Sequence, residues 1–168
     1  LPSQASILPI TASHVPALRR INSLLLSVPY PDSFYAALLD PSASGLLSRA
    51  ILWRDTPASD PKVIGGIVCR LEPSSTNPTT HAIYLQSLAL LSPYRAQGLA
   101  AAALEHIVSS AVLLPPASWD VQSVYAHVWT ENEDGLRWYA ARGFQREGRE
   151  PVRRYYYKLR PDTAWIVR

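Results

Sequence analysis

The chain has no methionine and only one cysteine, and none of its apolar runs is long enough to cross a bilayer. A single thiol, that of Cys69, excludes an internal disulfide and is typical of proteins in a reducing compartment. No N-terminal segment has the pattern of a secretory signal peptide. We therefore expect a cytoplasmic protein that does not enter a membrane. Because the chain starts at Leu1 and contains no methionine, we also expect it to be an excerpt of a longer polypeptide.

The chain also lacks a large net charge of either sign. The 168 residues carry a formal net charge of +3, the pI is near 9.2, and 48% of the residues are hydrophobic. This composition predicts one globular domain with its own core. Lysine and arginine are spread along the chain apart from residues 146–160. The mild positive charge therefore suits a small anionic ligand better than direct binding of nucleic acid.

Apolar periodicity and turn residues predict an alternation of strands and helices. The predicted strands are residues 7–10, 50–54, 63–71, 81–91, 121–129, 144–147 and 154–159. The predicted helices are residues 15–25, 32–39, 97–113 and 132–142. The helix between strands 81–91 and 121–129 predicts a right-handed crossover between parallel strands, whereas the three strands before it are joined by hairpins. The expected fold class is α/β, with a mixed sheet that carries helices on both faces.

The stretch from Leu85 to Val112 is the strongest local signal. An apolar strand ends at Pro93, and the segment Arg95-Ala96-Gln97-Gly98-Leu99-Ala100 then opens a helix rich in alanine and leucine. The first N–H groups of a helix have no partner within it, and the helix dipole favours negative charge there. We interpret this turn as a binding site for a pyrophosphate.

A second segment, Asn132 to Phe144, starts a helix directly after a strand and ends it at Gly143. Asn132 and Tyr139 lie seven residues apart, on one face of that helix. If this face lines the crevice beside Gly98, both residues contact a long ligand. The plainer interpretation is a helix-capping asparagine and a half-buried tyrosine.

The two segments together resemble the acetyl-CoA motifs of the GNAT acetyltransferases, in the same order and spacing. Further stretches resemble the NatE type of N-terminal acetyltransferase within that family, and the likeness runs from about Ile10 to Val167. These stretches are Val28 to Tyr35, Tyr84 with Leu91 to Arg95, Val124 to Val128, and Tyr156 to Lys158 with Pro161.

The resemblance implies a seven-stranded mixed sheet flanked by about four helices, and acetyl-CoA as co-substrate without a metal. It implies that Tyr84 and His127 act together as the general base through a water, and that Tyr139 lies near the thioester sulfur. The Leu88 amide would stabilise the oxyanion, and Leu90 would pair with the pantetheine arm. The implied cofactor-binding residues are Leu88, Ala89, Leu90, Arg95, Ala96, Gln97, Gly98, Leu99, Ala100, Asn132 and Tyr139. Because the acetyl group is transferred directly, Cys69 is expected to be a buried hydrophobe and not a nucleophile.

For the other substrate, the resemblance implies a protein N-terminus, with methionine followed by an apolar residue as the preferred start. The implied peptide-binding residues are Leu26, Ser27, Val28, Tyr30, Gln86, Tyr156 and Tyr157. In the family pattern Phe-Pro-Val stands where this chain has Leu26-Ser27-Val28, which predicts a first-residue pocket of different shape. The implied partners are the auxiliary and catalytic subunits of NatA and the ribosome.

Two other functions are compatible with the same motifs. One is a GNAT enzyme that acetylates lysine side chains or small amines, which would need a deep and narrow channel. The other is a weakly active subunit that binds a larger NatA-type complex. An intact pyrophosphate turn, with Arg95, Gly98 and Ala100 in place, favours an active enzyme.

Overall fold

The computed structural model describes residues 1–168 as one seven-stranded mixed sheet with four α-helices, as predicted. The sheet has the order β1-β2-β3-β4-β5-β7-β6. Its strands are β1 (Ala5–Pro9), β2 (Arg49–Trp53), β3 (Lys62–Pro73), β4 (His81–Leu90), β5 (Val121–Trp129), β6 (Arg146–Val152) and β7 (Ala164–Val167). The helices are α1 (Val15–Leu25), α2 (Asp32–Ala37), α3 (Leu99–Val112) and α4 (Glu133–Ala141), with short 3₁₀ turns at Ala12–His14 and Ser92–Tyr94. No helix combines the length and the hydropathy that a membrane span requires.

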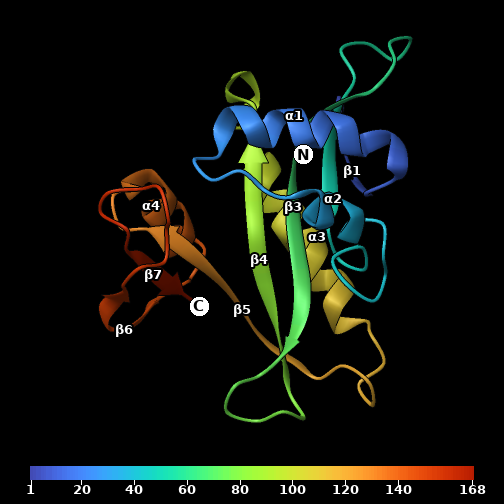
Figure 1. Ribbon diagram of the computed structural model, residues 1–168. Helices are drawn as coiled ribbons and strands as arrows, with labels where there is room; N and C mark the ends of the chain where they lie inside the picture. The colour runs from blue at the N-terminus through green and yellow to red at the C-terminus, as the bar shows by residue number, and fades with distance from the viewer.

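The helices cover both faces of the sheet (Figure 1). On one face α3 packs against a core that includes Ile67, Ile83 and Ile107, whereas α1 and α2 cover a smaller core on the other. Gly66 allows α1 to approach closely, because a Cβ there would lie 2.8 Å from a methyl carbon of Leu18. A larger residue at this position in β3 would collide with the helix.

The two central strands pair only over half of their length. β4 and β5 run parallel and are joined through α3, but their pairing ends at Leu85 and Ala126. Beyond this point β4 continues alongside β3, whereas β5 pairs with β7. Figure 1 shows β5 swinging away from β4 towards α4 and the C-terminal strands. The divergence leaves a wedge in the middle of the sheet, where one edge of β4 lacks a neighbouring strand.

The prediction of a strand at residues 154–159 is wrong. The last strand is β7, and residues 154–159 lie in the loop that joins β6 to it. The backbone N–H groups of Tyr155 and Tyr156 both donate to the carbonyl of Asp162, at 2.8 and 3.0 Å, and Arg154 has a φ of +56°. The segment therefore folds back on itself, and its three consecutive tyrosines do not occupy a sheet position.

Candidate active site

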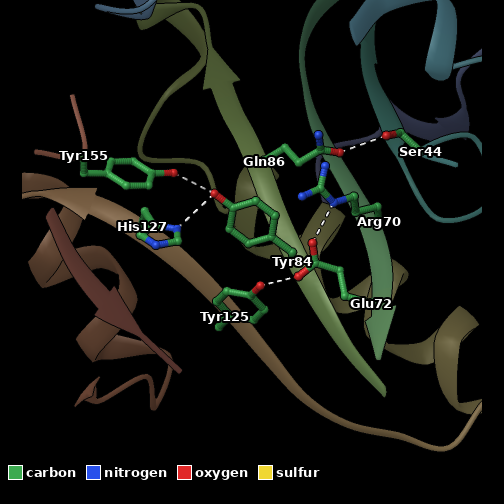
Figure 2. A network of polar contacts seen from close by, with 8 residues as sticks. All are labelled: Ser44, Arg70, Glu72, Tyr84, Gln86, Tyr125, His127 and Tyr155. Atoms are coloured by element: carbon green, nitrogen blue, oxygen red, sulfur yellow. Dashed lines mark hydrogen bonds and ion pairs between the residues drawn. The ribbon is translucent and has the colours of Figure 1, made fainter. Parts of the chain in front are cut away.

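Strand alternation places the candidate catalytic residues together on one face of the sheet. Ile83 and Leu85 of β4, and Ala126 and Val128 of β5, point into the core beneath α3. Their neighbours Tyr84 and Gln86, and Tyr125 and His127, therefore point to the opposite face, as Figure 2 shows. The side chains gather where the two strands begin to diverge.

The hydroxyl of Tyr84 contacts the imidazole of His127 directly, with 3.0 Å between Oη and Nδ1. Burial lowers the pKa of His127 and raises that of Tyr84 well above its usual value. At neutral pH the imidazole is thus uncharged and can accept a proton, whereas the phenol keeps its own. The two predicted residues form one hydrogen-bonded unit with a base at its end.

Sequence reasoning missed a third member of this unit, Tyr155. Its hydroxyl lies 2.8 Å from that of Tyr84, and its ring stacks on His127 with centroids 4.1 Å apart and planes 12° from parallel. Figure 2 shows Tyr155 and His127 on the same side of the Tyr84 hydroxyl. A run of three tyrosines, residues 155–157, offers no local signal of which ring faces the site.

The open edge of β4 presents backbone groups to the wedge. The Gln86 carbonyl accepts from the Tyr30 hydroxyl at 2.9 Å, and the Leu90 carbonyl accepts from Arg95 Nε at 2.8 Å. Leu91 N–H points the other way, towards β3, where it donates to Ile64. Backbone groups alternate along a strand, so the N–H of Leu88 points to the same edge as Gln86 and Leu90. β5 does not pair there, so this N–H has no neighbouring strand to bond and is available to a ligand in the wedge.

The turn before α3 presents further unpaired donors. None of the backbone N–H groups from Gln97 to Ala101 donates to a protein acceptor, and the first donor of the helix with one is Ala102, to Gly98 at 2.9 Å. Ala96 and Gly98 both have positive φ, of 62° and 78°, which explains why α3 starts at Leu99 and not at the predicted Gln97. Five adjacent N–H groups at the start of a 14-residue helix fit a pyrophosphate such as that of CoA.

In the segment from Asn132 to Phe144, Asn132 caps a helix, whereas Tyr139 is buried among aromatic rings. The side-chain oxygen of Asn132 accepts from the N–H of Gly135 at 3.0 Å and so caps α4. Tyr139 packs edge-on against Trp138 and Phe144, and burial raises its pKa to about 12. A phenol of this kind stays protonated and is suited to donate a hydrogen bond.

The residues predicted for the peptide end lie on several elements. Tyr30 reaches the edge of β4 through its bond to Gln86, whose side-chain oxygen accepts from Ser44 Oγ at 2.8 Å. Leu26 and Val28 are half-buried and Ser27 is exposed, all in the corner between α1 and α2. Tyr156 is half-buried beside Tyr155, with ring centroids 4.8 Å apart, whereas Tyr157 is 89% exposed. Of residues 155–157, Tyr155 is therefore the one that contacts the base, and Tyr156 packs against Tyr155.

Cys69 is completely buried in β3, and burial raises the pKa of its thiol to about 12. Its backbone N–H donates to Ser48 Oγ at 2.9 Å. A thiol that is neither exposed nor ionised is not a nucleophile, as predicted. The structure has no group of three or more histidine, cysteine, aspartate or glutamate residues arranged to hold a metal ion.

The sequence profile of the acetyltransferase (GNAT) family matches residues 15–144. Over 158 residues the chain is 26% identical to "N-alpha-acetyltransferase 50" of Danio rerio, and the match covers 94% of this chain and 83% of that protein. It is 25% identical to "Probable N-acetyltransferase san" of Drosophila melanogaster, covering 94% of this chain and 76% of that protein.

Two solved structures share the fold. Arabidopsis thaliana Naa50 in complex with the bisubstrate analogue CoA-Ac-MVNAL superposes with a TM-score of 0.77 at 24% identity, covering 98% of this chain and 97% of that one. Arabidopsis thaliana NAA60 in complex with acetyl-CoA superposes with a TM-score of 0.76 at 19% identity, covering 97% of both chains. The chain belongs to the acetyltransferase (GNAT) family, and within it the chain resembles N-terminal acetyltransferases of the NatE type.

Proposed function

We propose that the protein transfers an acetyl group from acetyl-CoA to the N-terminal amine of proteins that start with methionine and an apolar residue. The observation that carries the proposal is the Tyr84–His127 pair, which lies where β4 and β5 diverge. The free Leu88 amide follows on the same edge of β4, and the unpaired donors of residues 97–101 lie beyond the end of that strand. Tyr84 (which contacts the base), the oxyanion donor and the anion-binding turn thus follow one another along β4 and the turn after it.

Each group has a defined part in the reaction. An N-terminal ammonium has a pKa of about 8 and must lose a proton before its nitrogen can attack. The Tyr84 hydroxyl passes that proton on to Nδ1 of the uncharged His127, either directly or through a water. Acetyl-CoA, when bound, supplies the thioester carbonyl that the amine attacks. The Leu88 N–H stabilises the charge that develops on the carbonyl oxygen, and the protonated Tyr139 donates to the departing sulfur.

The peptide end favours a protein N-terminus over a lysine side chain. Tyr155 stacks on the base, Tyr156 packs against Tyr155, and Tyr30 donates to the edge of β4 at Gln86. Burial raises the pKa of Tyr30 to about 12 and also raises that of Tyr156. Protonated hydroxyls of this kind suit the amide groups of a peptide backbone close to its first residue. The bisubstrate analogue bound to Arabidopsis thaliana Naa50, CoA-Ac-MVNAL, carries a peptide that begins with methionine and valine, which supports the same preference here.

The resemblance extends the proposal to the setting of the enzyme. We propose that it works in the cytoplasm, attached to subunits of a NatA-type complex near the ribosome. The similar solved structures include the NatB acetyltransferase complex and the NatC complex, which supports this expectation. Co-purification of a tagged protein with a ribosome-bound auxiliary subunit would support it, and a strictly monomeric protein in a lysate would contradict it.

The test is an acetylation assay with acetyl-CoA and a peptide library varied at its first two residues. We expect peptides such as Met-Val-Asn-Ala-Leu to be acetylated at the α-amine, and the same peptides with a blocked N-terminus to be inert. Acetylation of an internal lysine in the blocked peptides would favour a lysine acetyltransferase instead. Absence of acetyl-CoA binding in calorimetry would exclude an active enzyme and would favour a binding subunit.

A further inference from the structure

A row of three aromatic and cationic side chains crosses the sheet at the catalytic tyrosine. Arg70 on β3, Tyr84 on β4 and Tyr125 on β5 are register partners and point to the same face. The rings of Tyr84 and Tyr125 stack with centroids 4.8 Å apart and planes at 29°. The guanidinium carbon of Arg70 lies 5.3 Å from the centroid of the Tyr84 ring. The ring of Tyr84 is thus held from both neighbouring strands.

Glu72 joins the two ends of this row. One carboxylate oxygen accepts from Arg70 Nε at 2.7 Å, and the other accepts from the Tyr125 hydroxyl. Figure 2 shows the carboxylate between these two side chains. The partner of Glu72 on β4 is Ala82, whose methyl group leaves room for the carboxylate to reach across the strand. The link therefore spans three strands and encloses one side of Tyr84.

This link differs from the other ion pairs of the protein in its burial. The Glu72 side chain is 24% exposed, whereas both members of the pair Lys62–Asp55 are more than half exposed. Screening by solvent is weaker at Glu72, and both of its bonds are charge-assisted, so it constrains its partners more strongly than a surface pair does. Burial and Glu72 together raise the pKa of Tyr125 to about 12, which keeps its hydroxyl a donor.

The row is also anchored at its far end. The guanidinium of Arg168 lies 4.6 Å from the centroid of the Tyr125 ring and donates to Ser123 on β5 at 2.9 Å. The same group pairs with Glu147 on β6 at 3.1 Å. Tyr125 is therefore held between Glu72 on β3 and Arg168, which is itself bonded to β5 and β6.

We propose that Arg70, Glu72 and Tyr125 are positioning residues, a clamp that fixes the Tyr84 hydroxyl for proton transfer to His127. The inference rests on the function proposed above. A small rotation of the Tyr84 ring would move its hydroxyl out of its 3.0 Å contact with Nδ1. Misplacement of a catalytic group by about 1 Å can cost up to about 100-fold in rate. The clamp prevents that rotation without itself contacting the reacting atoms.

The test separates turnover from binding. We expect Glu72→Ala and Tyr125→Phe to lower kcat about tenfold with Met-Val-Asn-Ala-Leu, with KM for acetyl-CoA and peptide unchanged within about twofold. Glu72→Gln keeps an acceptor of the same shape and should restore part of the loss. Asp55→Ala, which removes an exposed ion pair of the β2–β3 hairpin, is the matched control and should leave kcat unchanged. A kcat within about twofold of wild type in both clamp variants, or a loss confined to KM, would overturn the proposal.

A second measurement needs no substrate. In ¹⁵N NMR spectra of the free protein, the Nδ1 resonance of His127 reports its hydrogen bond to Tyr84. We expect this resonance to move in Glu72→Ala and Tyr125→Phe and to stay unchanged in Asp55→Ala. If no peptide is acetylated but the resonance moves, the clamp stands and the proposed function fails. If the wild type is active and the resonance does not move, the clamp fails. Tyr125→Phe removes a single hydroxyl and carries the test should Glu72→Ala not fold.

Discussion

The anion-binding part of the site is built from backbone groups, whereas the part around the base is built from side chains. The anion end, at residues 96–101, consists almost wholly of backbone N–H groups whose direction is set by two residues with positive φ. The base and the peptide end consist of side chains, chiefly Tyr30, Tyr84, His127 and Tyr155, that come from four separate segments. Substitution should therefore affect the first end through backbone conformation and the second through single functional groups.

This difference between backbone and side-chain groups also determines how a substitution in each part of the site lowers activity. Loss of one N–H donor among five leaves most of an anion site in place, whereas loss of the only base leaves no substitute. We therefore expect variants at the peptide end to change kcat, and variants at the anion end to change the KM for acetyl-CoA. The predictions below test that division, starting with the largest effect.

His127→Ala removes the base and should lower kcat by about 10² to 10⁴, with acetyl-CoA affinity nearly unchanged. Tyr84→Phe should also lower kcat strongly, because the hydroxyl that contacts Nδ1 at 3.0 Å is lost while the ring remains. Steady-state kinetics and calorimetry with acetyl-CoA would check both variants. Full activity in both would show that the pair is structural and that the base lies elsewhere.

Gly98→Ala tests the backbone end. A Cβ at Gly98 would meet no atom within 4 Å, so the variant is disfavoured only by its φ of +78°. That conformation costs a non-glycine residue about 1 to 2 kcal/mol, and we expect the turn to rearrange and KM for acetyl-CoA to rise about tenfold. The measurement is the dependence of the initial rate on acetyl-CoA concentration, and kcat at saturation should stay within about twofold of wild type.

Gly143→Ala is the matched control for this variant. Gly143 has a φ of +90° and also open space around its Cβ position, but it lies after the C-terminus of α4. Both variants should lose similar stability in thermal unfolding, while only Gly98→Ala should change KM for acetyl-CoA. Equal kinetic effects of the two would mean that the turn acts only through stability.

The difference between the two ends also explains what the sequence could predict. The anion turn follows from local chemistry, because an apolar strand, Pro93 and Gly98 determine its conformation within a few residues. Tyr84 and His127 were predicted by resemblance, and strand alternation alone places them on one face. Tyr155 could not be predicted, because its direction depends on a loop closed by the carbonyl of Asp162, and three consecutive tyrosines hide the register. Likewise, the predicted strand 63–71 stops just before Glu72, although β3 continues to Pro73.

Tyr155→Phe tests the member of the unit that sequence reasoning missed. The ring can still stack on His127, but the bond to the Tyr84 hydroxyl is lost. The removal of one hydrogen bond is worth about 0.5 to 1.5 kcal/mol, so we expect kcat to fall about three- to tenfold. Tyr157→Phe, at a position that is 89% exposed, should have no kinetic effect and controls for the loss of a hydroxyl. An effect of Tyr157→Phe equal to that of Tyr155→Phe would support the pair first predicted from the sequence.

The smallest expected effect is a shift in the titration of His127. Burial lowers its pKa below the usual value of about 6.5, and the Glu72 carboxylate partly offsets this by favouring the imidazolium. The other groups that face the ring are the side chains of Tyr84, Tyr125 and Tyr155, and Arg70 is paired with Glu72. The base is uncharged above its pKa, so kcat should hold at neutral pH and fall only as the pH drops through that value. Glu72→Gln removes the one negative charge and should move the NMR titration midpoint of His127 to still lower pH. A midpoint that moves upward would show that the charge of Glu72 does not raise the pKa of His127. Burial alone would then set the pKa of the base.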